Sequence, residues 1–156
     1  MIRRSFSSKS PLTVKPLYTT LVRQILETVS PVWNPHMQKD IAELDKIQHR
    51  AERLCDPRIT FQDLSQRRLR ADMCETYKIL HHEYRLEPDK FFTLSDDNLR
   101  GHNFKLSKQR SRTYIRKNYF SNRVVNAWNK LDNKTVNANN LSTFKERLEL
   151  GADARA

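Results

Sequence analysis

The chain has 156 residues, enough for one domain or one domain with tails, and 37% of them are hydrophobic. Its 29 Lys and Arg against 18 Asp and Glu give a formal net charge of +11. Only two glycines are present, which argues against compact β proteins and Gly-rich phosphate loops, since both use glycine where φ is positive. No apolar run reaches the ~18 residues of a membrane span, so no membrane partner is expected.

The first predicted helix follows a basic segment, residues 1–15, that contains no acidic side chain. Pro16 suits the first position of this helix, and an apolar stripe at i, i+4 spacing continues to just before Pro31. The stripe consists of Leu17, Leu21, Ile25 and Val29, with Val22 and Leu26 beside it.

Two further helices are predicted before residue 95. Gln38–Leu54 carries one apolar face, which contains Ile41, Leu44, Ile47 or Gln48, Ala51 and Leu54. A third helix runs from about Gln62 to Tyr84, with apolar side chains three and four residues apart. Its first turns are very basic, an unfavourable arrangement for the helix dipole that indicates a partner for Arg67, Arg68 and Arg70.

The C-terminal part begins with an irregular basic stretch in which Phe104, Leu106 and Lys108 alternate with polar residues, a pattern typical of an extended segment or hairpin. A fourth helix is predicted over Tyr114–Leu131. Ser142 is expected to cap a last helix, and residues from Gly151 onward to form an unstructured tail.

Charge is concentrated near the C-terminus. Between Leu99 and Leu131 there are nine basic residues and no acidic one. Such a segment repels itself unless a polyanion neutralises it, so the pattern favours a nucleic-acid partner. Aromatic side chains are interleaved with the charges; we expect Phe120 and Trp128 to be core residues, while Tyr114 or Tyr119 could stack on unpaired bases.

Catalytic and metal-binding patterns are lacking. Cys55 and Cys74 have no CxxC or HxxxH companions, so free thiols in a reducing compartment are expected, with no metal site and no cofactor. The acidic pair Asp96 and Asp97 lies in a polar turn rather than between apolar strands, which favours a solvated loop over a polymerase metal site. No catalytic residues are therefore predicted.

Several ordered blocks together resemble the region after the polymerase core in reverse transcriptases of non-LTR (LINE) retrotransposons of the jockey and chicken-repeat type. The blocks are Leu17–Arg23, Ser30–His36, Leu44–Ala51, Arg67–Met73, Arg110–Arg112, Arg116–Leu131 and Ser142–Leu148. Departures include Gln24 for an expected proline, Ala71 for an expected glycine, and a spacing between Leu54 and Gln66 about a dozen residues short of the family's. The resemblance spans about residues 1–149.

The family's parent protein is an RNA-directed DNA polymerase with an endonuclease. The aromatic-x-Asp-Asp motif of its palm is not in this chain, so the resemblance implies a fragment without catalytic activity of its own. It also implies a nuclear or cytoplasmic location; the mitochondrial-like N-terminus is then an internal piece of the polyprotein and Met1 an internal methionine.

The expected fold is all-α, a single small domain of four or five helices with an irregular basic segment. The expected ranges are a basic N-terminal segment (1–15), a helical thumb-like region (16–94), a basic C-terminal helical region (95–149) and a tail (150–156). The expected partner is RNA or RNA–DNA hybrid, bound without sequence preference and in a salt-dependent way. The expected binding residues are Arg100, Lys105, Lys108, Arg110, Arg112, Tyr114, Arg116, Lys117, Tyr119 and Arg123. The alternatives are an inert product of a decayed element and a helical protein–protein module using the Ile41–Leu54 or Leu69–Tyr84 face.

Overall fold

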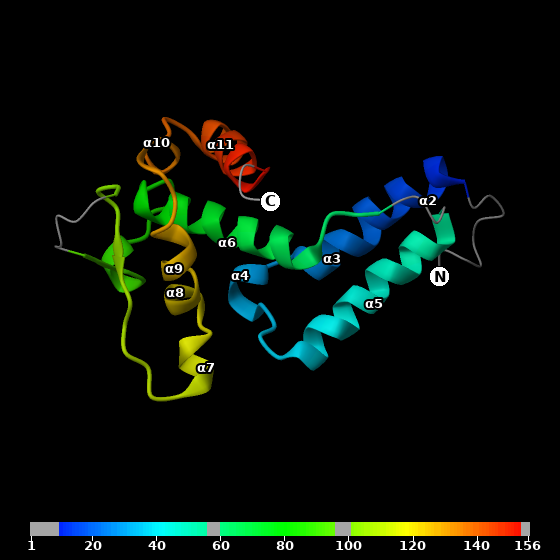
Figure 1. The fold of residues 1–156 in the computed structure, drawn as a ribbon, viewed down its shortest axis with the longest axis horizontal. Helices are drawn as coiled ribbons and strands as arrows, with labels where there is room; N and C mark the ends of the chain where they lie inside the picture. Colours follow the sequence, from blue (N-terminus) through cyan, green and yellow to red (C-terminus); the bar gives the residue numbers. More distant parts are fainter. Residues whose placement is uncertain (1–9, 56–59, 96–100, 154–156) are drawn as a thin grey trace. The chain divides into compact units, whose positions relative to one another are not determined.

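The computed structural model describes residues 10–55, 60–95 and 101–153 (Figure 1). These residues are mainly helical and their strands are only two residues long, so the all-α prediction is confirmed. The chain divides into two compact units, Met1–Arg68 and Leu69–Ala156. The division falls inside the helix that spans Leu64–Leu80. Among the described residues, no helix is long and apolar enough to cross a membrane.

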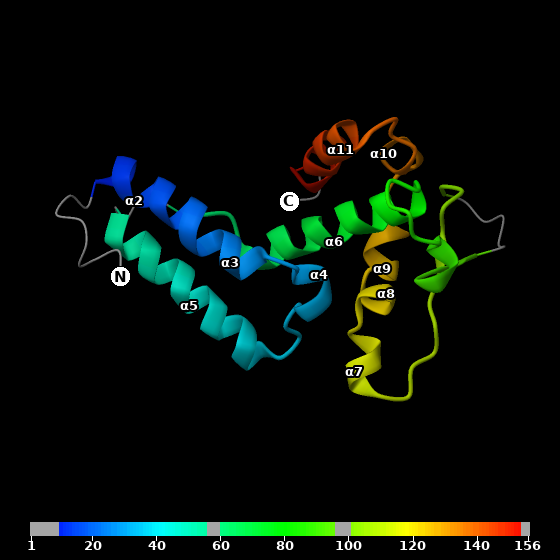
Figure 2. The ribbon, with the colours of Figure 1, turned by 180° about the vertical axis from the view of Figure 1, so that it is seen from behind.

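In the first unit, one continuous helical stretch lies alongside a long helix, as both ribbon views show (Figures 1 and 2). The stretch consists of α2 (Pro11–Leu17), the π-helical turn η1 (Tyr18–Val22) and α3 (Arg23–Glu27). The short helix α4 (Ser30–Trp33) connects it to the long helix α5 (Gln38–Cys55). The predicted bounds of α5 were therefore right to within one residue.

The helical stretch begins five residues before the predicted start. Pro11 lies in the first turn, where a backbone N–H would have no acceptor within the helix, so proline loses no hydrogen bond there. Pro16, in contrast, lies inside the helix. An internal proline removes one hydrogen bond and crowds the preceding turn. The helix widens just after it, and the Arg23 amide donates to the Tyr18 carbonyl, five residues back, as in a π-helix.

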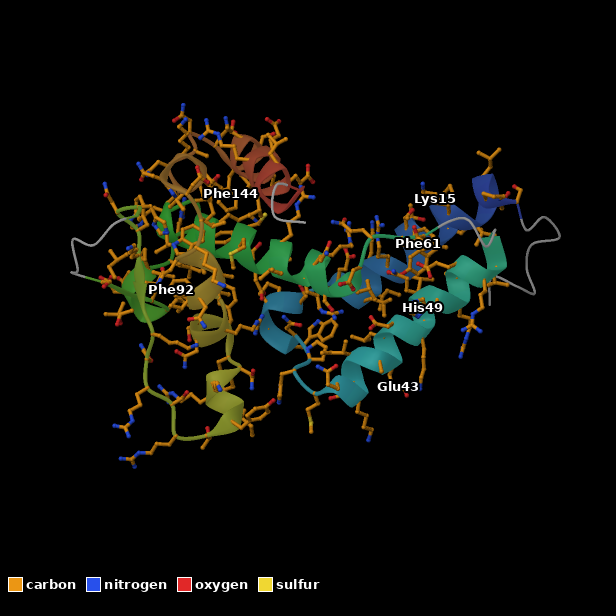
Figure 3. All side chains as sticks on the ribbon, viewed as in Figure 1. Lys15, Glu43, His49, Phe61, Phe92 and Phe144 are labelled. Atoms are coloured by element: carbon orange, nitrogen blue, oxygen red, sulfur yellow. The ribbon has the colours of Figure 1, made fainter. Side chains whose placement is uncertain are left out.

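The buried stripe of this stretch is displaced by one residue from the predicted one. Val14, Tyr18 and Leu26 are buried, whereas Leu21 and Ile25 are 57% and 74% exposed. The prediction of a Leu17–Val29 core stripe was wrong because Tyr18 takes the inward position. Its ring lies 4.6 Å from that of Phe61, which Figure 3 shows beside the helical stretch.

Tyr18 also determines which residue of α5 is buried. The Tyr18 hydroxyl donates to Gln48 Oε1 at 3.2 Å, and Gln48 is 6% exposed while Ile47 is 38% exposed. Of the two residues left open for this position of the face, Gln48 is therefore the one that points inward. Burial raises the pKa of Tyr18 to about 12, so the phenol stays protonated and keeps its role as a donor.

The chain turns sharply after α3. Val29 has a φ of 54°, a left-handed conformation that is costly for a β-branched residue. Trp33 stabilises the turn, because its indole Nε1 donates to the Thr28 carbonyl at 2.6 Å.

The second unit starts within α6 (Leu64–Leu80) and continues through several short elements to a longer C-terminal helix. These are η2 (Pro88–Lys90), β1 (Thr93–Leu94), β2 (Leu106–Ser107), α7 (Tyr114–Lys117), α8 (Phe120–Arg123), α9 (Val125–Trp128), α10 (Asn133–Val136) and α11 (Leu141–Asp153). β1 and β2 pair antiparallel, Thr93 with Ser107 and Leu94 with Leu106, which confirms the expected extended segment around Leu106.

An aromatic cluster forms the core of the second unit. Trp128 and Phe144 are fully buried, and Tyr77 is 2% exposed. The Tyr77 and Phe144 rings stack at 4.5 Å, and the Tyr77 hydroxyl donates to the Ala138 carbonyl at 2.7 Å. Figure 3 shows Phe92 and Phe144 within this unit; Phe92 lies 5.7 Å from the Phe120 ring. The core therefore joins α6 to α9 and α11.

α6 ends four residues before the predicted Tyr84. His82 adopts a left-handed φ of 55°, and its amide donates to the Ile79 carbonyl. The Glu83 amide donates to the Lys78 carbonyl, five residues back, which completes a Schellman motif. Histidine occupies the position that glycine usually takes in this motif, so the sequence carried no glycine signal for the end of the helix.

The predicted helix Tyr114–Leu131 is broken into α7, α8 and α9. Asn118 ends α7 and donates its side-chain amide to the Tyr114 carbonyl at 2.8 Å. Asn122 likewise donates to the Arg116 carbonyl at 3.1 Å. Asparagine side chains compete with the backbone for helical hydrogen bonds, and this explains why the single long helix does not form.

The C-terminal elements differ from expectation in two places. The cap of α11 is Asn140, whose Oδ1 accepts from the Thr143 amide at 2.8 Å, rather than the expected Ser142. α11 also continues to Asp153, so residues 150–153 of the expected tail (150–156) are helical. Before α11, Asp132 caps the short helix α10 by accepting from the Thr135 amide.

Candidate nucleic-acid interface

The cationic segment, defined here as residues 107–117, runs from the end of β2 to the end of α7 (Figure 1). Residues 108–112 are neither helix nor strand, and in the described part of the chain their backbone groups make no hydrogen bond. α7 begins where Thr113 accepts a hydrogen bond from the Arg116 amide through its hydroxyl oxygen, at 3.3 Å. The segment therefore consists of an irregular stretch without backbone hydrogen bonds to the described chain, followed by a capped helical turn.

Five basic residues of the predicted binding set lie in this segment and are exposed. None of the five forms an ion pair with any carboxylate in the ranges 10–55, 60–95 and 101–153. Their charges therefore face solvent without a counter-charge from the described chain. The five residues are Lys108, Arg110, Arg112, Arg116 and Lys117.

Arg123 is placed differently. Its Nε and Nη2 donate to both oxygens of Asp72 at 2.9 and 2.8 Å, and its Nη1 donates to the Asn118 carbonyl at 3.3 Å. The side chains of Arg123 and Asp72 are 15% and 3% exposed. This bidentate pair ties α8 to α6, so Arg123 serves the fold of the second unit and its charge is compensated.

Lys105 immediately precedes β2 and is half-buried. It covers Gly101: a Cβ added at Gly101 would lie 2.6 Å from Lys105 Cε. Gly101 also has a φ of 135°, which only glycine adopts readily. Lys105 lies two residues before the cationic segment. Arg100 and the acidic pair Asp96 and Asp97 lie outside the described residues.

The aromatic residues divide into two groups. Trp128 is fully buried and Phe120 packs against the core, as expected. Tyr114 and Tyr119 are 62% and 58% exposed; Tyr114 is the first residue of α7 and Tyr119 is the residue that precedes α8. Ile115 is also 62% exposed between them, at a position to which the sequence pattern assigned no role.

The other basic cluster has its partners within the chain. Arg67 forms a bidentate pair with Glu27 in the first unit, and Arg70 pairs with Glu149 in the second. Arg68 is 2% exposed and donates to the Ser65 hydroxyl. These intramolecular contacts account for the basic start of α6 without an external ligand for Arg67 or Arg70.

Neither histidines nor cysteines assemble a reactive centre in the described ranges. No three His, Cys, Asp or Glu residues of this part of the chain are close enough to hold a metal ion. Cys74 is a buried free thiol, and burial raises its pKa, which favours the unreactive protonated form. His102 is buried against the Trp128 carbonyl, to which its Nε2 donates at 3.2 Å, and burial lowers its pKa.

Comparison with known proteins gave no match to a family model, a curated protein or a solved structure.

Proposed function

We propose that this chain is a C-terminal fragment of a LINE-type reverse transcriptase that binds RNA or RNA–DNA hybrid through the cationic segment, without catalytic activity of its own. The observation that carries the binding role is the set of five exposed cations for which the described chain supplies no carboxylate. Phosphate groups would neutralise them and release counterions, the main source of sequence-independent affinity. The sequence resemblance supports the origin.

The packing of the second unit supports a binding module over a protein–protein adaptor built on α6. Met73, Tyr77 and Leu80, the central residues of the proposed Leu69–Tyr84 adaptor face, are 2–4% exposed and belong to the aromatic core. A partner helix would have to displace that core to reach them. The cationic segment, in contrast, lies on the surface and requires no rearrangement to meet a polyanion.

The test is fluorescence anisotropy of a labelled 20-nucleotide RNA, and of the same RNA paired with DNA, between 50 and 200 mM NaCl. Five phosphate contacts on a single strand predict a slope of about −3.5 in log K against log salt. Over this fourfold change in salt, affinity should fall by about 100-fold. Lys108→Gln/Arg110→Gln/Arg112→Gln should reduce the slope to about −1.4, because three contacts are lost.

The matched control is Lys39→Gln/Lys46→Gln/Arg50→Gln on α5, which lowers the net charge by the same three units at exposed positions of the first unit. It should leave the salt slope close to that of the unchanged protein. An equal loss of affinity in both triple variants would show that only net charge matters and would reject the assignment to the cationic segment. Affinity that does not change with salt would reject phosphate binding altogether.

The alternative of an inert product of a decayed element is tested by thermal unfolding. A maintained protein with the core described above should unfold in one cooperative transition, or in two if the compact units unfold separately. A gradual loss of helical signal with temperature would favour the decayed product.

A further inference from the structure

Two tyrosines, one within the cationic segment and one just after it, are exposed, whereas the central aromatic side chains of the core are buried. Tyr114 and Tyr119 are 62% and 58% exposed, in contrast to Trp128 and Phe144, which are fully buried. Ile115 adds a third exposed apolar side chain, also 62% exposed, within the same six residues. Cations and exposed aromatic rings are therefore combined at one short element.

The backbone holds both tyrosines in defined places. Tyr114 is the first residue of α7, and its carbonyl accepts from the Asn118 side-chain amide at 2.8 Å. Tyr119 precedes α8 in an extended conformation, with φ −62° and ψ 150°, and its carbonyl accepts from the amides of Asn122 and Arg123. The rings thus project from two anchored positions on either side of one helical turn, with Arg116 and Lys117 between them.

This combination discriminates between forms of nucleic acid. Phosphates are present in duplexes and single strands alike, so cations alone bind both. The faces of the bases are covered by their neighbours in a duplex and are accessible to side chains only where bases are unpaired. An aromatic ring beside a cation is the arrangement by which proteins hold unpaired bases irrespective of their sequence.

Building on the proposed function, we propose that Tyr114 and Tyr119 stack on unpaired bases while the cationic segment contacts the phosphates, so that the protein selects single-stranded RNA or DNA over duplex. The unpaired backbone of residues 108–112 fits this role, since this part of the segment can adjust to a flexible strand without breaking hydrogen bonds of the fold.

The test compares binding of a labelled 20-nucleotide oligouridine, oligothymidine, a 20-base-pair DNA duplex and an RNA–DNA hybrid at one salt concentration. Heparin, a polyanion without bases, serves as the probe for charge alone. The variants are Tyr114→Leu/Tyr119→Leu, which removes both aromatic rings, and Tyr114→Phe/Tyr119→Phe, which keeps them. Because both side chains are exposed, both variants should keep the circular dichroism spectrum and melting temperature of the unchanged protein.

The unchanged protein should bind the single strands more tightly than either duplex. The leucine variant should bind the single strands about tenfold or more weakly, with unchanged binding to duplexes and heparin, and the phenylalanine variant should retain full affinity. Equal affinity of the unchanged protein for single strands and duplexes, or single-strand binding that the leucine variant leaves intact, would overturn the inference. In both of those cases the protein still binds nucleic acid, whereas failure of the proposed function would abolish binding of every nucleic-acid probe.

Discussion

At the scale of single residues, charge alone did not distinguish a binding residue from a structural one. Arg123 belongs to the same run of basic residues as Arg112 and Arg116, yet Asp72 holds it at 2.8 Å across 51 positions of sequence. A contact between residues so far apart leaves no trace in local spacing. For this reason the sequence could indicate a basic surface but could not exclude Arg123 from it.

Asp72→Ala should destabilise the second unit by about 3 kcal/mol, because it leaves the largely buried Arg123 guanidinium without its counter-charge. Urea denaturation followed by circular dichroism measures this loss. Asp72→Ala/Arg123→Met should be less destabilised than Asp72→Ala alone, since no uncompensated charge remains buried. A double variant that is less stable than Asp72→Ala would contradict this account of the pair.

His102 predicts a pH dependence of stability. Burial lowers its pKa in the folded protein below the ordinary value of 6.5. The unfolded chain therefore binds the proton at a higher pH than the folded one does, and stability falls as the pH drops through about 6.5 towards the lowered value. Above that window the contribution of His102 is constant.

The measurement is the free energy of unfolding at pH 7.5 and pH 5.5. His102→Asn should reduce the difference between the two pH values. A pH dependence that stays the same in this variant would show that His102 is not its source.

At the scale of elements, predictability followed the length of the helix. α5 and α6 have long amphipathic patterns, and their predicted starts lie within two residues of the observed ones. α7, α8 and α9 are each four residues long, too short for a periodic pattern, and hydrogen bonds from Asn118 and Asn122 set their boundaries. The apolar stripe of the first helix had the right period but the wrong face, because only tertiary contacts place Tyr18 inward.

For the candidate site, too, some features could be predicted from the sequence and others could not. The composition of Leu99–Leu131 indicated a basic, aromatic-containing surface, and five exposed cations lie within residues 107–117 of that window. The exposure of Ile115, beside Tyr114, had no signal in the residue spacing, because the helix expected over Tyr114–Leu131 ends its first piece at Asn118.

The irregular stretch of residues 108–112 in the cationic segment should be the preferred site of trypsin cleavage among the described residues. A protease needs several residues of exposed backbone free of hydrogen bonds, and Lys108, Arg110 and Arg112 are trypsin sites within such a stretch. Mass spectrometry of early digestion products identifies the first cuts. Oligouridine at low salt should slow cleavage here, and high salt should restore it.

A small peptide substrate serves as the control, since its cleavage shows whether the oligonucleotide inhibits trypsin itself. First cuts within α5 or α6 would contradict the assignment of residues 108–112 as open chain.

At the scale of the whole molecule, the two compact units differ in what fills them. The first unit buries a tyrosine with a glutamine partner, whereas the second contains the aromatic cluster of Tyr77, Trp128 and Phe144. Every residue of that cluster lies between Met73 and Leu148. The second unit therefore carries its own core.

A fragment of residues 60–156, which contains all of α6, should consequently fold without the preceding residues. We expect one cooperative thermal transition by far-ultraviolet circular dichroism, and salt-dependent RNA affinity within about threefold of the full chain, because the cationic segment lies in this fragment. A fragment that shows no cooperative transition would mean that the core depends on the first unit.

The chain's two tryptophans fall one in each unit: Trp33 is 39% exposed in the first, and Trp128 is fully buried in the second. The two indoles therefore emit from environments of different polarity: Trp33 at longer wavelength and Trp128 at shorter wavelength. Replacing Trp33 with phenylalanine would leave an optical probe of the second unit alone, and denaturation of that variant would reveal whether the halves of the chain come apart together or in succession.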